Sequence, residues 1–290
     1  MERFTKKVFR FENATENRIN ALERSQLYFS TASKFNDLFD VSVDSHSGIF
    51  RWTFDDERLQ LVLATLYGAP YSPEWPIDES LLQYLYKWLA SDPEFQPLDD
   101  SGFEILIPPK EEMQLKEKIG DIFSSTPICC FFESDVNNPL MWAHYANNHD
   151  GFCVEYEIRL SGLGSPWSLS RDYLSENFLI LPVSYTTSKS SVTALDFLLN
   201  SFVEAQRALS TKSYHWAYEK EVRLINMRGK EGLTALPRGI IPTSIYIGSR
   251  VRESSPEMYE RLTLASKNLN LDIYEMRADQ FSMALKPQKI

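Results

Sequence analysis

Long apolar runs are missing from this sequence, and so are several motifs that mark common enzyme classes. No run approaches the roughly 18 apolar residues that cross a bilayer. The opening residues, MERFTKKVFRF, have no apolar core long enough for a secretory signal. We therefore expect a cytoplasmic protein with no membrane partner. The sequence has no Gly-rich phosphate loop, GxGxxG, GxSxG or HExxH, which disfavours P-loop NTPases, ordinary dehydrogenases, elbow hydrolases and zincins.

Cysteine is scarce, with three residues in a chain of 290. Cys129 and Cys130 are adjacent in the apolar run PICCFF, and Cys153 lies further on. The odd count and the spacing fit neither a disulfide framework nor a zinc site. Adjacent residues of a strand point to opposite faces, so Cys129 and Cys130 cannot both bind one ion. We expect reduced core cysteines and no bound metal.

Basic residues are outnumbered, with 30 Lys and Arg against 40 Asp and Glu, which gives a formal net charge of −10. This balance argues against a broad electrostatic grip on a nucleic-acid backbone. The densest basic stretch, KPQK near residue 290, is predicted as a frayed tail. The hydrophobic content of 43% is enough for a sizeable core.

Hydrophobic periodicity predicts an α+β protein with a mixed or antiparallel sheet core, in one domain over residues 1–290. The first elements predicted are strand 8–11, helix 15–25 with Ile19 and Leu22 turned inward, and strand 27–30. The later predictions are strands 128–133, 152–158, 179–185, 218–226, 245–248 and 272–276, helices 139–147, 192–211 and 256–268, and a loop at 229–242. Strands and helices that do not alternate regularly are typical of α+β folds.

Between about residues 51 and 125 the pattern changes to helical. The stretches DDERLQLVLATLYG, DESLLQYLYKWLASD and KEEMQLKEKIGDIF have the apolar spacing of amphipathic helices. Pro-rich joints at 69–76 and 93–109 separate them. We therefore predict a helical insertion within the single domain.

The segment NPLMWAHYANNHDGFCVEYE, residues 138–157, crowds aromatic and polar side chains just before a predicted strand. Trp142, His144 and Tyr145 carry apolar rings with polar tips, the kind of side chain that lines small-molecule pockets. An amphipathic helix whose rings and amides tie down a turn would show the same pattern. We predict that these three residues form one wall of a ligand site.

A second candidate site lies in YEKEVRLI, residues 218–225. In an extended strand, Glu219, Glu221 and Arg223 would share one face. That face is either the solvated outside of an antiparallel strand or the edge of a cleft, which the aromatic residues just before it favour. Because such a face buries no apolar surface, we expect Glu221→Gln to leave stability nearly unchanged.

Three blocks of the sequence carry a family resemblance. They are LYFSTASKFNDLFD near the start, LMWAHYANNHDGFCVEYE in the middle and WAYEKEVRLI towards the end. Together they resemble an uncharacterised family of bacterial and phage-associated proteins, domain of unknown function number 2971. The resemblance spans most of the chain but implies no particular reaction.

A more remote resemblance does imply a reaction. Arg10 in VFRF, Tyr28 and Ser30 in LYFS, and the late pair Glu219 and Glu221 resemble, in order and type, the Arg–Ser–Glu pattern of the ADP-ribosyltransferase superfold. This implies an ADP-ribosyltransferase-like core that uses NAD to modify a macromolecule, protein or nucleic acid, as a toxin or phage-defence effector. The superfold's second motif is usually Ser-Thr-Ser, whereas this chain has YFST.

The same resemblance assigns roles to individual residues. Glu221, with Glu219 beside it, would be catalytic by stabilising the positive charge that develops on the ribose, and Arg10 would hold the pyrophosphate. The other residues that would bind NAD lie in the LYFS strand, the FNDLFD loop and the aromatic segment: Tyr28, Ser30, Asn36, Trp142, His144 and Tyr145.

The FNDLFD loop leaves two other functions open. Asn36 and Asp37 favour an Asx-type turn, but Asp37 and Asp40 together with Glu221 also supply the carboxylates of a Mg²⁺-dependent, nuclease-like site. The remaining alternative is a non-catalytic module that binds a nucleotide or a protein through its aromatic residues. Each enzymatic interpretation requires the three blocks to meet at one site.

Overall fold

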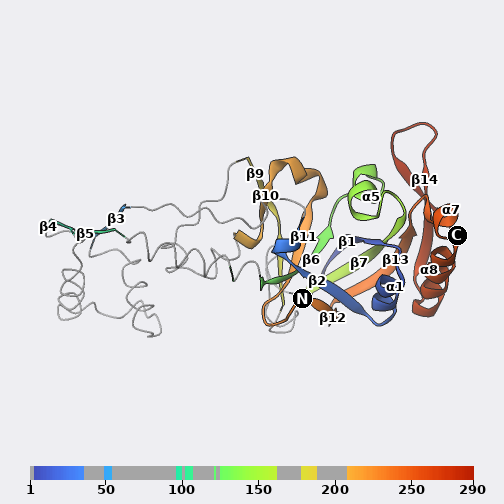
Figure 1. Ribbon diagram of the computed structural model, residues 1–290, viewed down its shortest axis with the longest axis horizontal. Helices are drawn as coiled ribbons and strands as arrows, with labels where there is room; N and C mark the ends of the chain where they lie inside the picture. Colours follow the sequence, from blue (N-terminus) through green and yellow to red (C-terminus); the bar gives the residue numbers. More distant parts are fainter. Residues whose placement is uncertain are drawn as a thin grey trace. The chain divides into compact units, whose positions relative to one another are not determined.

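The computed structural model describes residues 3–35, 49–53, 96–99, 102–106, 121, 125–161, 178–187 and 208–290 (Figure 1). The chain divides into two compact units. One comprises Met1–Asp40, Ser124–Thr187 and Lys212–Ile290, and the other Val41–Phe123 and Ser188–Thr211. The first unit contains every side chain of the candidate site described below.

A ten-stranded sheet forms the framework of the first unit. Its strands are β1 (Arg3–Asn13), β2 (Gln26–Thr31), β6 (Pro127–Phe132), β7 (Gly151–Ser161), β8 (Phe178–Pro182), β11 (Glu221–Asn226), β12 (Gly232–Ala235), β13 (Ile240–Ile247), β14 (Asp272–Ala278) and β15 (Leu285–Lys289). Their order is β12-β2-β6-β1-β7-β13-β14-β15, and β11 lies between β6 and β8. β13 and β14 pair in parallel, whereas the other neighbours are antiparallel. The predicted α+β class with a mostly antiparallel sheet is confirmed.

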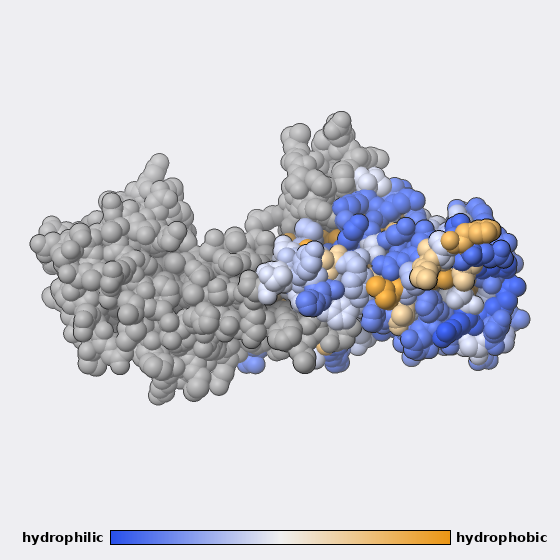
Figure 2. Space-filling model, turned by 90° about the horizontal axis from the view of Figure 1, so that it is seen from above, coloured by the Kyte–Doolittle hydropathy of each residue, from blue (hydrophilic) through white to orange (hydrophobic). Residues whose placement is uncertain are grey.

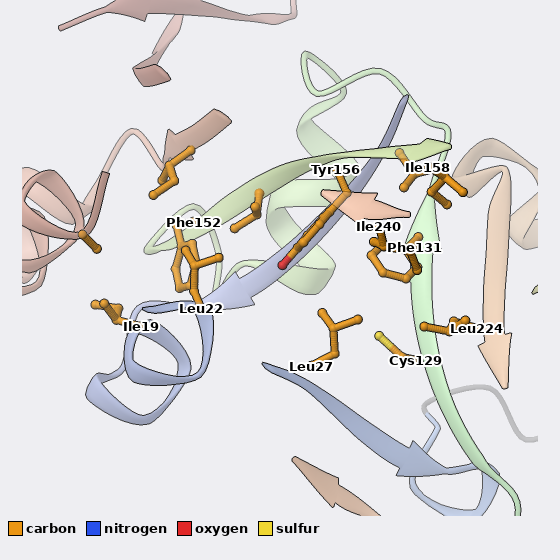
Figure 3. Packing of buried hydrophobic residues seen from close by; sticks show 14 of the residues in the cluster. Ile19, Leu22, Leu27, Cys129, Phe131, Phe152, Tyr156, Ile158, Leu224 and Ile240 are labelled. Carbon is orange, nitrogen blue, oxygen red and sulfur yellow. The ribbon is translucent and has the colours of Figure 1, made fainter. Parts of the chain in front are cut away.

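Helices cover both faces of this sheet. The helical elements are α1 (Glu16–Glu23), η1 (Ala32–Lys34), α5 (Pro139–Tyr145), η2 (Tyr214–Glu219), α7 (Val251–Ser254) and α8 (Pro256–Leu269). Ile19 and Leu22 of α1 join the larger core cluster, as predicted (Figure 3). Leu262 of α8 belongs to the same cluster. Trp142 of α5 belongs to the smaller cluster. Adjacent strand residues alternate between the two clusters, so α5 packs on the face opposite α1 and α8.

Two segments predicted to lack regular structure are strands. Residues 229–242, predicted as a loop, contain β12 and the start of β13. KPQK, predicted as a frayed tail, lies in β15, which pairs with β14 from Tyr274↔Lys289 to Ala278↔Leu285. Neither stretch has a strong apolar alternation of its own. Hydrogen bonds to a neighbouring strand, which are invisible in a local pattern, hold both in the sheet.

Three strands of the second unit lie outside the three predicted helical stretches. β3 (Ile49–Thr53), β5 (Gly102–Leu106) and β4 (Gln96–Asp99) form a three-stranded antiparallel sheet. β4 and β5 therefore occupy a segment predicted as a Pro-rich joint, and β3 ends at Thr53, before the first predicted helical stretch begins at Asp55. The three predicted helical stretches fall almost entirely outside the described residues, as does most of predicted helix 192–211. The end of that helix is wrong, because Thr211 begins β10 (Thr211–Ser213), which pairs with β9 (Ser184–Thr186).

The described surface is mainly hydrophilic in the view of Figure 2, with a few apolar areas. Two large apolar side chains in the connection between β14 and β15, Phe281 and Met283, are 93% and 100% exposed and add nothing to the core. No helix within the described ranges is both long enough and apolar enough to cross a membrane.

Candidate functional site

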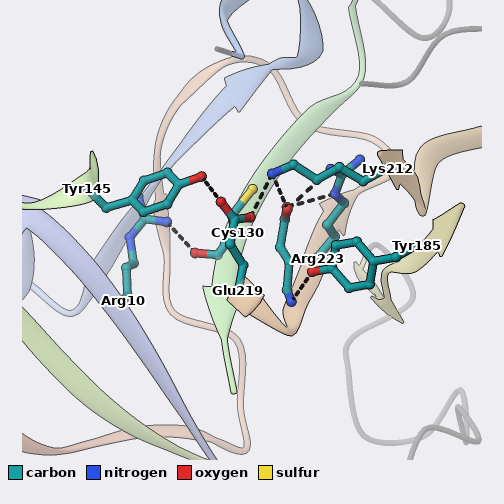
Figure 4. Close-up of polar contacts among 8 residues, drawn as sticks. Arg10, Cys130, Tyr145, Tyr185, Lys212, Glu219 and Arg223 are labelled. Atoms are coloured by element: carbon teal, nitrogen blue, oxygen red, sulfur yellow. Dashed lines mark hydrogen bonds and ion pairs between the residues drawn. The ribbon is translucent and has the colours of Figure 1, made fainter. Parts of the chain in front are cut away.

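Four charged side chains are buried together where β10, η2 and β11 meet (Figure 4). Lys212 Nζ lies 2.7 Å from Glu219 Oε2 and 2.9 Å from Glu221 Oε2. Arg223 Nε donates to Glu221 Oε1 at 2.8 Å. None of the four residues is more than 4% exposed. We call Lys212, Glu219, Glu221 and Arg223 the ion cluster.

Backbone geometry explains how Glu219 and Glu221, two residues apart, reach the same ammonium group. Glu219 ends the 3₁₀ helix η2, Lys220 adopts a left-handed conformation with φ of 47°, and β11 begins at Glu221. The predicted strand 218–226 is therefore wrong in its first three residues. The turn at Lys220, rather than strand alternation, aims both carboxylates at Lys212.

The burial of β11 contradicts the solvated outer face predicted for this segment. Glu221 pairs with Phe132 of β6, and Val222 pairs with Pro182 of β8, so β11 has a neighbour on each side. Its charged face is neither solvated nor at a sheet edge. Charged side chains remain in such a place when partners of opposite sign compensate them, and Lys212 supplies a cation that the local pattern does not contain.

The two carboxylates of the ion cluster have pKa values displaced in opposite directions. Burial on its own raises the pKa of Glu221, but Arg223 and Lys212 outweigh it and lower that pKa to about 2. Burial dominates at Glu219 and raises its pKa despite the contact with Lys212. Burial disfavours the charged form of Lys212, yet Glu221 and Glu219 together raise its pKa. At neutral pH Glu221 is ionised and Lys212 is protonated.

Side chains from the other sequence blocks surround the ion cluster. The Tyr145 hydroxyl donates to Glu219 Oε1, and the backbone N–H of Glu221 donates to Tyr185 Oη at 2.7 Å. The Arg223 guanidinium lies 5.4 Å from the centre of the Phe35 ring. Phe35 opens the FNDLFD block and Tyr145 belongs to the central block, so residues of all three blocks meet here. Asn36, Asp37 and Asp40 lie outside the described residues.

Three aromatic side chains lie together beside Lys212 of the ion cluster. His144 is exposed, whereas Trp216 and Tyr218 are half-buried. The His144 ring centre is 5.7 Å from that of Trp216 and 6.5 Å from that of Tyr218, and the latter two are 6.2 Å apart. Lys212 Nζ lies 5.1 Å from the centre of the Trp216 ring, a cation–π contact. We call His144, Trp216 and Tyr218 the aromatic patch.

Arg10, predicted to hold a pyrophosphate, is engaged by the protein itself. Its Nε donates to Glu12 Oε1 at 2.6 Å, and its Nη1 donates to Cys129 Sγ at 2.9 Å and to Cys130 O at 3.0 Å. Its Nη2 donates to Tyr28 O at 3.3 Å. These bonds join β1 to β6 and β2. Arg10 therefore links neighbouring strands, and its donors face protein groups instead of an open anion site.

The two predicted ligands on β2 also have local partners. Tyr28 Oη donates to Glu231 at 2.9 Å, and its ring lies 4.6 Å from the Arg18 guanidinium. Ser30 Oγ donates to the Thr31 carbonyl at 3.4 Å. Within the part of the chain that the structure describes, no hydrogen bond or ion pair joins Tyr28 or Ser30 to the ion cluster.

The central block divides into residues that reach the site and residues that hold the fold. Asn138 caps α5 by accepting from Leu140 N at 3.0 Å, which fixes the start of the helix. His144 and Tyr145 then emerge at the site. Trp142 is completely buried, and its Nε1 donates to Val136 O at 2.7 Å. Trp142 therefore packs in the smaller core cluster, and its role in ligand binding stays a prediction.

The polar run after α5 builds a structural turn. Asn147, Asn148 and His149 all have left-handed backbones, with φ of 46°, 54° and 71°. The turn docks on the end of β13, where Gly248 N donates to Gly151 O at 2.8 Å. A Cβ on Gly248 would lie 2.3 Å from the His149 carbonyl oxygen, so only glycine fits this approach. Residues 147–149 therefore fit the alternative prediction for the segment 138–157, in which polar side chains hold a turn in place.

Sequence reasoning missed Lys212 and Tyr185 as site residues. Lys212 is a single lysine beside a predicted helix end, and Tyr185 is one aromatic residue of a short predicted strand. Neither carries a local motif. Only the pairing of β9 with β10 and of β8 with β11 brings them together, so no signal in the sequence pattern would have found them.

The cysteines occupy opposite faces of β6, as expected. Cys129 belongs to the larger core cluster, and Cys130 packs against the smaller one. Burial raises the pKa of Cys129 to about 11, and it raises the pKa values of Cys130 and Cys153 well above the usual thiol range. Among the described residues, no three His, Cys, Asp or Glu side chains are grouped so that they could hold a metal ion.

A comparison with known protein families gives a match over the region that contains this site. Residues 141–224 match the family described as Protein of unknown function (DUF2971). The match confirms the family resemblance for the middle and late blocks, whereas LYFSTASKFNDLFD lies outside the matched residues. The DUF2971 region runs from α5 into β11 and includes Tyr145 and the whole ion cluster. No curated protein and no solved structure matches the chain, so the ADP-ribosyltransferase resemblance stays a prediction.

Proposed function

We propose that this protein is an ADP-ribosyltransferase-like enzyme that consumes NAD and modifies a macromolecular acceptor at the ion cluster. One observation carries the proposal. Glu219 and Glu221 share the ammonium of Lys212, yet their pKa values are displaced in opposite directions. When two neighbouring carboxylates have different pKa values, one stays ionised while the other takes up a proton more readily. The two can therefore serve different roles in one reaction.

Glu221 suits the electrostatic role in such a reaction. When the bond between nicotinamide N1 and ribose C1′ breaks, its electron pair stays on N1 and positive charge develops on the ribose. Glu221, with a pKa of about 2, remains ionised throughout the physiological range. An ionised group fixed before the reaction stabilises developing charge without reorganisation.

Glu219 suits the role of a base. A nucleophile of the acceptor forms the new bond to C1′ and gives up its proton. Glu219, with its raised pKa, is the better proton acceptor of the pair. Its Oε1 already accepts a hydrogen bond from Tyr145, so a polar group orients this carboxylate.

The aromatic patch suits recognition of the nicotinamide ring. A planar cationic ring stacks favourably on Trp216, Tyr218 or the imidazole of His144. Glu219 and Glu221 are 0% and 2% exposed. The reaction therefore requires the side chains of the patch to move aside as substrate binds, which the half-buried positions of Trp216 and Tyr218 favour.

The test is to mix the purified protein with NAD and to measure nicotinamide release, with and without cell extract. We expect release by the wild type, and a fall of about a hundredfold or more in Glu219→Gln. Glu260→Gln, at an exposed position on α8, is the matched control. Circular dichroism of each variant checks that it is folded.

Binding is measured separately by calorimetry. Trp216→Ala should weaken NAD binding by about tenfold, because stacking on an aromatic ring is worth roughly 1–3 kcal/mol. Tyr214→Ala, which removes a 61% exposed ring from the same helix, is the control. Absence of both NAD binding and nicotinamide release would overturn the proposal, and NAD binding without release would identify a non-catalytic binding module.

A further inference from the structure

Lys212 occupies the central place in the ion cluster. It comes from β10, whereas its two acidic partners come from the end of η2 and the start of β11. The Oε2 atom of each carboxylate accepts a hydrogen bond from Lys212 Nζ, at 2.7 Å for Glu219 and 2.9 Å for Glu221. One side chain thus joins three elements that are separate in the fold.

This sharing fixes the directions of the remaining carboxylate oxygens. With its Oε2 on Lys212, Glu219 presents Oε1 to Tyr145. Glu221, held in the same way, presents Oε1 to Arg223 at 2.8 Å. The two carboxylates thus share Lys212 but have different second partners, Tyr145 for Glu219 and Arg223 for Glu221.

We propose that Lys212 is a positioning residue, whose ammonium holds Glu219 and Glu221 as a pair and directs their Oε1 atoms towards different partners. The catalytic part of this inference rests on the proposed function, but the pairing itself does not. Two carboxylates buried at one site repel each other unless a cation lies between them or one takes up a proton. Among the residues that the structure describes, Lys212 is the cation within hydrogen-bonding distance of both.

A double-mutant cycle in urea unfolding at neutral pH tests the pairing. We expect Lys212→Met to lower the unfolding midpoint strongly. Adding Glu219→Gln to it should restore part of the loss, because one of the two repelling charges is then gone. Lys230→Met, at an exposed lysine, should leave the midpoint unchanged.

The same cycle can refute the pairing. Additive effects, or a double variant less stable than Lys212→Met alone, would overturn the inference. If Lys212→Met does not fold, folding of the double variant supports the pairing. Failure of both to fold, while Glu219→Gln alone folds, contradicts it.

Kinetics distinguish positioning from a merely structural role. Lys212→Arg keeps the charge but changes the donor geometry from a point to a planar fork. We expect kcat for nicotinamide release to fall by about 10- to 100-fold, with KM for NAD within about threefold and the urea midpoint unchanged. An unchanged kcat with a raised KM would overturn the positioning role. If the wild type releases no nicotinamide, the proposed function fails while the urea cycle still decides the pairing.

Discussion

Replacing Glu221 by Gln tests the physical interpretation of the ion cluster. Glu221 is 2% exposed, and its Oε1 and Oε2 accept from Arg223 and Lys212. The Gln carbonyl can still accept from Arg223, but its NH₂ group would then face the Lys212 ammonium, donor against donor. The expectation of unchanged stability rested on an open strand face. Burial removes that premise, so we now expect a large loss.

The size of the loss follows from the pKa of Glu221. Folding lowers it from 4.5 to about 2. At about 1.4 kcal/mol for each tenfold change in proton affinity, this is worth about 3 kcal/mol of stability at neutral pH. Removing one partner of a buried ion pair typically costs about 3–5 kcal/mol. We therefore expect Glu221→Gln to lower the free energy of unfolding by about 3–5 kcal/mol at pH 7.

The pH dependence has a definite sign. Because the folded-state pKa of Glu221 lies below its unfolded value of 4.5, its stabilisation is fully present above that value. It is lost as the pH falls towards the folded-state pKa of about 2. The difference between wild type and Glu221→Gln should therefore be largest at neutral pH and shrink in acid.

The assay is urea unfolding followed by circular dichroism at about pH 7 and about pH 3, with linear extrapolation to water. Glu260→Gln, at an exposed glutamate, should match the wild type at both pH values. A difference below about 1 kcal/mol at pH 7, or one that does not change with pH, would refute the account of a compensated buried carboxylate.

Three further predictions use the same unfolding assay or a thiol reagent. Tyr145→Phe removes the donor to Glu219 but keeps the ring, so it should cost about 1.5–3 kcal/mol; a cost below about 0.5 kcal/mol would show that the bond is dispensable. Gly248→Ala places a methyl group 2.3 Å from the His149 carbonyl oxygen and should destabilise by about 1–3 kcal/mol or more; wild-type stability would mean that the turn relaxes freely. The three cysteines have raised pKa values and should react with Ellman's reagent only on unfolding; rapid reaction of native protein at about pH 8 would contradict this.

Much of the fold of the first unit was predictable because its strands and helices carry strong periodic patterns. β1, β2, β6, β7 and α8 appear close to their predicted positions, and Ile19 and Leu22 face the core. The errors occur where pairing with a distant segment overrides a weak local pattern, as in β12 and β15. Register and neighbour choice depend on contacts between residues far apart in sequence, which periodicity does not record.

The candidate site was predictable in its parts but not in its arrangement. The sequence indicated Tyr145, Glu219 and Glu221, because aromatic residues with polar tips and closely spaced acidic residues stand out in any chain. It did not indicate that Arg10 would be occupied by Glu12 and the carbonyls of neighbouring strands. A hydrogen-bond donor has the same appearance in a sequence whether it is free or satisfied.

Sequence patterns were sufficient to predict the α+β class, the resemblance that the family match covers over residues 141–224, and several segments that approach the site. The tertiary structure alone decided that β11 lies between two strands and that Lys212 closes a buried ion cluster. The physical reason is that a charge pattern along one strand does not reveal its counter-ion. The sequence pattern suggested a solvent-exposed face because burying two carboxylates is costly. That cost is offset by Arg223 on the same strand and by Lys212 from another element.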